Sequence, residues 1–93
     1  MIKVEGRLLS ATHKPAREPG GVGGVVVKIW AESDDLLLDF WLRADEELAD
    51  AVTDLPVYSQ VVAAVRPIPV RTERGIAYRL RLTAVALKDA DHG

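Results

Sequence analysis

Aromatic and cationic side chains alternate in the parts of this sequence that have a β-strand pattern. Trp30 follows Lys28 by two positions, and Trp41 precedes Arg43 by two positions. Because successive side chains of a strand point to opposite faces, each tryptophan shares a face with its cation. Flat rings can stack nucleic-acid bases at about 1–3 kcal/mol per base, while nearby cations hold the phosphates.

Further cations and one tyrosine extend this candidate surface. Two arginines take the outer positions of an expected strand over residues 76–87, and a tyrosine takes the outer face of an expected strand over residues 58–66. Two expected loops, residues 12–24 and 67–75, each add two cations, which are placed to close over a bound strand. The candidate nucleic-acid-binding residues are Lys14, Arg17, Lys28, Trp30, Trp41, Arg43, Tyr58, Arg71, Arg74, Arg79 and Arg81.

Charge is unevenly distributed along the 93 residues. The net charge of −2 argues weakly against a nucleic-acid-binding protein, because such domains are usually basic. However, residues 1–31 carry five cations against two acids, and residues 57–93 carry six against three, so each end has a net charge of +3. Residues 32–56 carry nine acids and one arginine, a net charge of −8. This asymmetry predicts one face for an anionic partner, with the acidic segment turned away from it.

Hydrophobic periodicity predicts the elements that must position these residues. A period of two predicts five strands, over residues 2–8, 25–32, 36–43, 58–66 and 76–87. One helix is predicted over residues 44–52. Its acidic residues are concentrated in the first turn, where the helix dipole favours them, and its apolar residues form one stripe. Residues 67–75 form a loop or an extended β-ribbon. The expected fold is mainly β, a five-stranded OB-fold barrel with one short helix between strands three and four.

The same alternation assigns the core. It places the two tryptophans outside and the apolar residues of each strand inside. In the helix, the inward stripe comprises Leu48, Ala51, Val52 and Leu55. The expected inward strand residues are Val25, Val27, Ile29 and Ala31; Leu36, Leu38, Phe40 and Leu42; Val57, Ser59, Val61, Ala63 and Val65; and Ile76, Tyr78, Leu80 and Leu82.

The residue types that enzymes and metal sites need do not occur at useful spacings. The two histidines, His13 in the first loop and His92 in the tail, have no serine or cysteine nucleophile at a recognisable spacing. There is no cysteine for a thiolate site or a disulfide. Residues 20–24 are glycine-rich but lack the Lys-Ser/Thr of a phosphate loop, and the acids of residues 45–54 read as a solvated helix face. We expect no enzyme, no metal and no cofactor.

Length and hydropathy limit the organisation of the chain. A chain this short fills one core, so we expect a single domain over residues 1–88 and a flexible tail over residues 89–93. The N-terminus is charged where a signal peptide would be apolar, and the longest apolar run, residues 61–65, cannot span a bilayer. These features predict a cytoplasmic protein without a membrane partner.

Three short segments are informative together: residues 1–5, residues 55–59 and residues 75–84, the last of which includes Tyr-Arg-Leu-Arg-Leu. They resemble the corresponding segments of the filamentous-phage single-stranded-DNA-binding, or helix-destabilising, proteins. The resemblance covers under a third of the chain and implies an OB-fold dimer that coats single strands cooperatively. In place of that family's stacking tyrosines and phenylalanine, this chain offers Trp30 and Trp41.

Residues and resemblance together predict a protein that binds single-stranded DNA without strong sequence preference, in replication or recombination. RNA remains an alternative ligand. The exposed apolar residues Ile68 and Val70 between the last two strands predict a homodimer formed through this segment. A different class of function stays open, a protein-interaction or assembly module in which the outward tryptophans anchor a partner.

Overall fold

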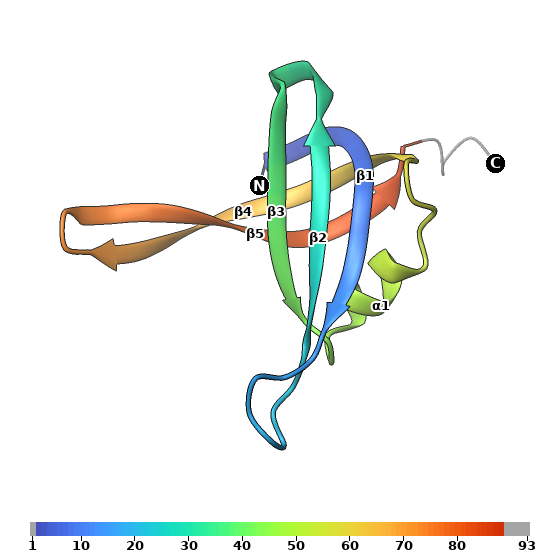
Figure 1. Cartoon of the computed structure of the whole chain (residues 1–93). Helices are drawn as coiled ribbons and strands as arrows, with labels where there is room; N and C mark the ends of the chain where they lie inside the picture. The colour runs from blue at the N-terminus through green and yellow to red at the C-terminus, as the bar shows by residue number, and fades with distance from the viewer. Residues whose placement is uncertain (1, 89–93) are drawn as a thin grey trace.

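The computed structural model describes residues 2–88, which form one antiparallel sheet of five strands and one short helix (Figure 1). The predicted mainly β class and the order of three strands, a helix and two strands are confirmed. A single 3-10 turn, η1 (Glu32–Asp34), leads into the third strand. The strands are β1 (Ile2–Lys14), β2 (Gly24–Ala31), β3 (Leu36–Arg43), β4 (Gln60–Thr72) and β5 (Gly75–Leu87), and the helix is α1 (Glu47–Thr53).

The long strand β1 connects the two halves of the sheet, whose order is β3-β2-β1-β4-β5. Its first half pairs with β4, its second half pairs with β2, and Arg7 has a partner in both. A register shift between Leu8 and Ser10 marks the bend. At Gly6 a Cβ atom would overlap the carbonyl oxygen of Trp30, so a residue without a side chain is needed where the strands cross closely.

This bend curls the sheet until its two edge strands, β3 and β5, approach one another. Among the described residues, no hydrogen-bonded ladder joins the two edges. The result is a strongly curved sheet with an inner face and an outer face, and with a seam between β3 and β5 (Figure 1).

The inner face of the curled sheet holds the core. The predicted inward residues of β2 are all buried, and so are Val61, Ala63 and Val65 of β4. The prediction is wrong at the strand ends: Leu36 is half exposed beside the turn, and Val57 and Ser59 lie in the loop before β4. Leu36 is the first residue of β3, and Val57 and Ser59 precede β4, so strand alternation does not bury them.

The helix α1 covers one end of this core, and it is shorter than predicted. It begins at Glu47 rather than residue 44, because residues 44–46 form a turn in which the Glu46 N–H donates to the carbonyl of Arg43. Its buried residues are Ala49 and Val52. The face that packs on the core contains Ala49 and Val52, so Ala51, which we expected inside, is exposed.

Beyond the core, β4 and β5 continue as a two-stranded ribbon that projects to one side (Figure 1). We name residues 66–81 the ribbon. Here the sequence prediction is wrong: Ile76, Tyr78 and Leu80 were expected inside but are 65%, 69% and 38% exposed. They do lie on the face that continues the core, but within residues 2–88 Ile76 and Tyr78 extend past the part of the sheet that could cover them. The radius of gyration is 14.2 Å, against about 12 Å for a compact domain of this length.

A loop joins β1 to β2 and projects from one end of the sheet (Figure 1). It spans residues 15–23 and is shorter than the predicted residues 12–24, because β1 continues to Lys14 and β2 begins at Gly24. His13 therefore lies in β1, paired with Val25, and not in the loop. The predicted flexible tail, residues 89–93, lies outside the described residues.

None of the helices within residues 2–88 has the length and apolar character needed to cross a membrane.

Candidate functional site

Trp41 is the most exposed aromatic side chain on the outer face of the β2–β3 pair. It lies on β3 opposite Val26, and 59% of it is exposed. Its indole ring packs over the backbone of Gly24, where a Cβ atom would overlap the ring atoms Cε2, Cζ2 and Nε1. Because Gly24 has no side chain, the indole packs directly on the backbone there, which fixes its position. More than half of the surface of Trp41 stays open to solvent.

Two hollows meet at Trp41. One lies beneath the β1–β2 loop, has a volume of about 720 Å³, and is lined in part by Lys14, Arg17 and Val26. The other, of about 510 Å³, lies along the seam between β3 and β5. We name the two hollows together the Trp41 groove. Sites for small molecules usually measure about 300–1,000 Å³, so each half has room for a nucleobase and its sugar.

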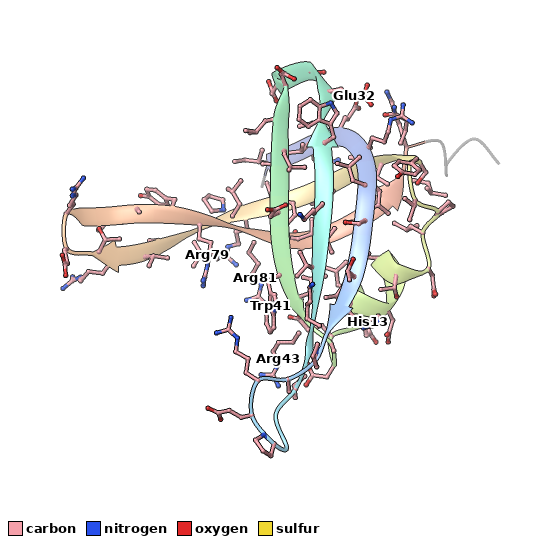
Figure 2. The ribbon with its side chains drawn as sticks, in the orientation of Figure 1. His13, Glu32, Trp41, Arg43, Arg79 and Arg81 are labelled. Carbon is pink, nitrogen blue, oxygen red and sulfur yellow. The ribbon has the colours of Figure 1, made fainter. Side chains whose placement is uncertain are left out.

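The seam half of the Trp41 groove brings together residues that are far apart in sequence. Figure 2 shows Arg79, Arg81, Trp41 and Arg43 following one another from the base of the ribbon to the end of β3. The predicted site residues that line the groove are Lys14, Arg17, Trp41, Arg43, Arg79 and Arg81. The structure thus assembles six of the eleven candidates around one exposed ring.

The acids at the start of α1 do not all turn away from the groove, as the charge pattern had predicted. Arg43 Nε and Nη2 donate to the two carboxylate oxygens of Asp45, at 3.1 and 3.0 Å. Arg81 Nη2 donates to Glu46 Oε1 at 3.2 Å, and Glu46 itself lines the groove. Glu46 was missed as a site residue, because the sequence placed it inside the helix rather than in the turn before it.

Trp30 lies on the same outer face as Trp41 but at the other end of the β2–β3 pair. It is half-buried and lies opposite Leu37. Four positions along β2 separate it from Val26, the partner of Trp41, which is a distance of about 13 Å. Trp30 lines neither hollow, so the structure does not combine the two tryptophans in one site.

The cation beside Trp30 is already paired. Arg7 lies opposite Trp30, and its Nε donates to Glu32 Oε1 at 3.1 Å. The same carboxylate oxygen accepts from Gln60 Nε2 at 3.2 Å. Arg7 Nη1 also donates to the carbonyl oxygen of Tyr58 at 2.7 Å. This network ties η1, β1 and the start of β4 together, which is a structural role.

Tyr58 belongs to this end of the molecule and not to the Trp41 groove. It lies in the loop before β4 with a φ of 69°, so its predicted place on the outer face of a strand is wrong. Its backbone N–H donates to the Leu8 carbonyl at 2.6 Å, while 66% of the residue is exposed. A turn in which the Ser59 N–H donates to the Pro56 carbonyl at 3.3 Å precedes β4, which begins only at Gln60.

The remaining candidates line neither hollow. Lys28 is exposed on the outer face of β2 between the two tryptophans, two positions before Trp30 and opposite Asp39 of β3. Arg71 lies near the tip of the ribbon, three positions or about 10 Å beyond the groove residue Ile68. Arg74 lies in the turn at the tip itself. As described, the two tip arginines do not close over Trp41.

Comparisons with known proteins found no matching family model, no similar curated protein and no similar solved structure. The resemblance to filamentous-phage proteins therefore stays a prediction. In residues 2–88, no three His, Asp or Glu side chains are grouped so that they could hold a metal ion.

Proposed function

We propose that this protein binds single-stranded nucleic acid, with single-stranded DNA as the expected ligand, in the Trp41 groove. One observation carries the proposal: an exposed indole, held in a fixed position over Gly24, lies among five cations contributed by β1, the β1–β2 loop, β3 and β5. An exposed ring offers a π-face to any base, and the surrounding cations follow the backbone phosphates.

A binding mode of this kind has little sequence preference. Stacking on Trp41 accepts every base, because all four bases have a flat π-face. Lysine and arginine contacts to phosphate carry no sequence information. The lack of a strong base preference expected from the sequence therefore also fits the groove. The cellular role that we propose on this basis is to coat or protect single strands during replication or recombination.

The arrangement of elements supports an OB-type barrel. The sheet order β3-β2-β1-β4-β5, with β3 beside β5 and α1 between β3 and β4, has the connectivity of that barrel. In OB folds, the loop between the first two strands and the loop between the last two flank the ligand face. Here these are the β1–β2 loop and the ribbon, which lie on either side of Trp41.

Titration with poly(dT) tests the proposal. The strand should quench tryptophan emission, and the affinity should fall with salt with a log–log slope of about −0.7 for each phosphate neutralised. Titration with poly(U) under the same conditions separates DNA from RNA. If neither polymer changes the emission or binds at low salt, single-strand binding is excluded.

A second function, self-assembly, is favoured by the exposed ribbon. Its core-side face carries Ile76, Tyr78 and Leu80 together with two prolines, and these are open to solvent in the single chain. A 93-residue chain without disulfides gains stability when such a surface is buried against a second copy. Pro67 and Pro69 pair with β5 but have no N–H to donate to a further strand, which limits open-ended strand pairing.

Sedimentation of the wild type and of a variant with Ile76→Asp and Tyr78→Asp tests the homodimer. We expect a dimer that becomes monomeric in the variant. A control with Thr72→Asp and Arg74→Gln, both at the ribbon tip, lowers the net charge by the same two units. A wild-type monomer excludes the homodimer. A dimer that survives both changes places the contact elsewhere. An assembly-only module would keep the dimer and fail to bind either polymer.

A further inference from the structure

The cations of the Trp41 groove fall into two groups. Arg43 and Arg81, on the helix side, are each held by a carboxylate, Asp45 and Glu46 respectively. Lys14, Arg17 and Arg79, on the loop and ribbon sides, have no ion pair within residues 2–88. The groove therefore offers a ligand free cations on its loop and ribbon sides and occupied cations on its helix side, between them.

Hydrogen bonds hold the carboxylates of Asp45 and Glu46 in defined positions. Asp45 contacts Arg43 through two parallel hydrogen bonds, which is the geometry that best fits a guanidinium to a carboxylate. Glu46 accepts from the Arg43 backbone N–H at 2.9 Å with one oxygen and from Arg81 with the other. Glu46 thus bridges the end of β3 to β5 across the seam.

Both ion pairs are also exposed enough for each arginine to exchange its carboxylate partner for a phosphate. The side chains of Arg43 and Asp45 are both more than half exposed, and only Glu46, at 32%, is partly covered. Exposed ion pairs stabilise a folded chain little. A phosphate oxygen presents the same acceptor geometry as a carboxylate oxygen, so it can replace the carboxylate on either arginine.

We infer that Asp45 and Glu46 form an acidic latch that competes with the phosphates of a bound strand for Arg43 and Arg81. This inference rests on the proposed function and describes how that site is regulated. In the free protein the latch is closed, and Lys14, Arg17 and Arg79 make the first phosphate contacts around Trp41. A strand that extends toward α1 must displace the two carboxylates, which lowers its affinity and reduces the number of counterions that binding releases.

The test compares two variants that lose the same charge. The latch variant carries Asp45→Asn and Glu46→Gln. The control variant carries Glu47→Gln and Asp50→Asn, which removes two exposed acids of α1 that line neither hollow. Both variants gain two units of net charge, so a general increase in attraction for polyanions affects them equally. Thermal unfolding of each checks that the fold is retained.

Affinity for poly(dT), followed by tryptophan fluorescence over a range of salt, is the readout. We expect the latch variant to bind about three- to tenfold more tightly at low salt. Its log–log slope should be steeper by about 1.4, because two more phosphates are neutralised at about 0.7 each. The control variant should stay within about twofold of wild type with an unchanged slope. Equal gains in both variants, or no gain in the latch variant, would overturn the latch.

A second measurement separates failure of the latch from failure of the proposed function. The Nε–H NMR signals of Arg43 and Arg81 should shift in the latch variant without nucleic acid, and on addition of poly(dT) to wild type. If wild type binds poly(dT) while these signals do not move, the latch alone is wrong. If neither wild type nor the latch variant binds poly(dT) or poly(U), the proposed function is wrong and the latch falls with it.

Discussion

The two ends of the β2–β3 pair carry the same kinds of side chain in different states. At one end Trp41 is exposed beside Arg79, which has no ion pair in residues 2–88. At the other end Trp30 is half-buried and its cross-strand neighbour Arg7 is held by Glu32, whereas Lys28, two positions before Trp30, has no ion pair in residues 2–88. Residue type and strand face are therefore shared by both ends. The ends differ because Trp30 is partly covered by other residues and Arg7 is held in an ion pair, whereas Trp41 and Arg79 remain open to a ligand.

Replacing each tryptophan in turn should give the largest difference in ligand affinity between the two ends of the β2–β3 pair. Trp41→Ala should weaken binding of poly(dT) by about 1–3 kcal/mol, roughly five- to 150-fold, because a stacked base loses its ring. Its melting temperature should change little, since the side chain is mostly exposed. Trp30→Ala should leave the affinity near wild type and lower the free energy of unfolding, because a half-buried ring leaves a gap.

The readouts are fluorescence anisotropy of a labelled dT oligomer, which does not depend on the removed tryptophan, and thermal unfolding. The contrast fails if Trp30→Ala reduces affinity as much as Trp41→Ala does. In that case the strand must run the length of β2 and β3 and not only through the Trp41 groove.

A side chain at position 24 should damage the Trp41 end while keeping both tryptophans. Gly24→Ala places a methyl group where the indole of Trp41 lies, so the ring must leave its seat. We expect a loss of affinity of about 1 kcal/mol, which is roughly fivefold and is smaller than the loss in Trp41→Ala. In the Trp41→Ala background the same change should cost nothing further, and a double-mutant cycle measures this coupling.

The salt dependence of binding should distinguish free cations from structural ones. Arg79→Gln should reduce the log–log slope by about 0.7, because one phosphate contact is lost. Arg7→Gln serves as the matched change at the other end, and it should leave the slope unchanged. Binding isotherms at four or five salt concentrations provide both slopes. Equal reductions would show that Arg7 contacts phosphate in spite of its ion pair.

The smallest effect is expected on the stability of the Trp30 end. Arg7→Gln removes an ion pair in which both side chains are about half exposed, at 41% and 46%, and a hydrogen bond to the Tyr58 carbonyl. The loss of unfolding free energy should be about 0.5–1 kcal/mol, since exposed pairs contribute little. Urea unfolding measures it. A loss several times larger would mean that this network holds β1 and β4 together.

Local patterns predicted the parts of the fold in which each strand has a covered face. Alternation identified the buried residues of β2 and the outward place of Trp41, because both depend only on period two and on a wall opposite. It failed for Ile76 and Tyr78, whose pattern is that of a core strand but whose ribbon extends past the wall. The lengths of the strands decide which residues have another part of the sheet opposite them. β4 continues past its buried residues into the ribbon, so the residues of β5 that pair with it there remain exposed.

Residue types predicted which side chains belong to the candidate site. The contacts between segments far apart in sequence then showed which of these side chains lie together. The sequence identified Arg79 and Trp41 and, through the expected barrel, placed them on one outer surface, but it did not show which cations of that surface would be held in ion pairs. It could not separate Trp30 from Trp41 either, because the separation depends on the register of β2 against β3. The contribution of Glu46 became visible only once the start of α1 was known, since a shift of three residues moves that carboxylate from the helix to the groove.

The shared strand β1 also has a consequence for how the chain folds. The β1–β2–β3 half forms from neighbouring segments, whereas the β1–β4 ladder joins Ile2 to Val65, which are 63 positions apart. Closing such a large loop costs entropy before any contact compensates for it, so refolding should be slow for a chain of this size. Until β4 arrives, residues 2–6 present an unpaired edge next to an open apolar face. A fragment that stops before β4 should therefore aggregate, and the two halves should not be separable into independent folding units.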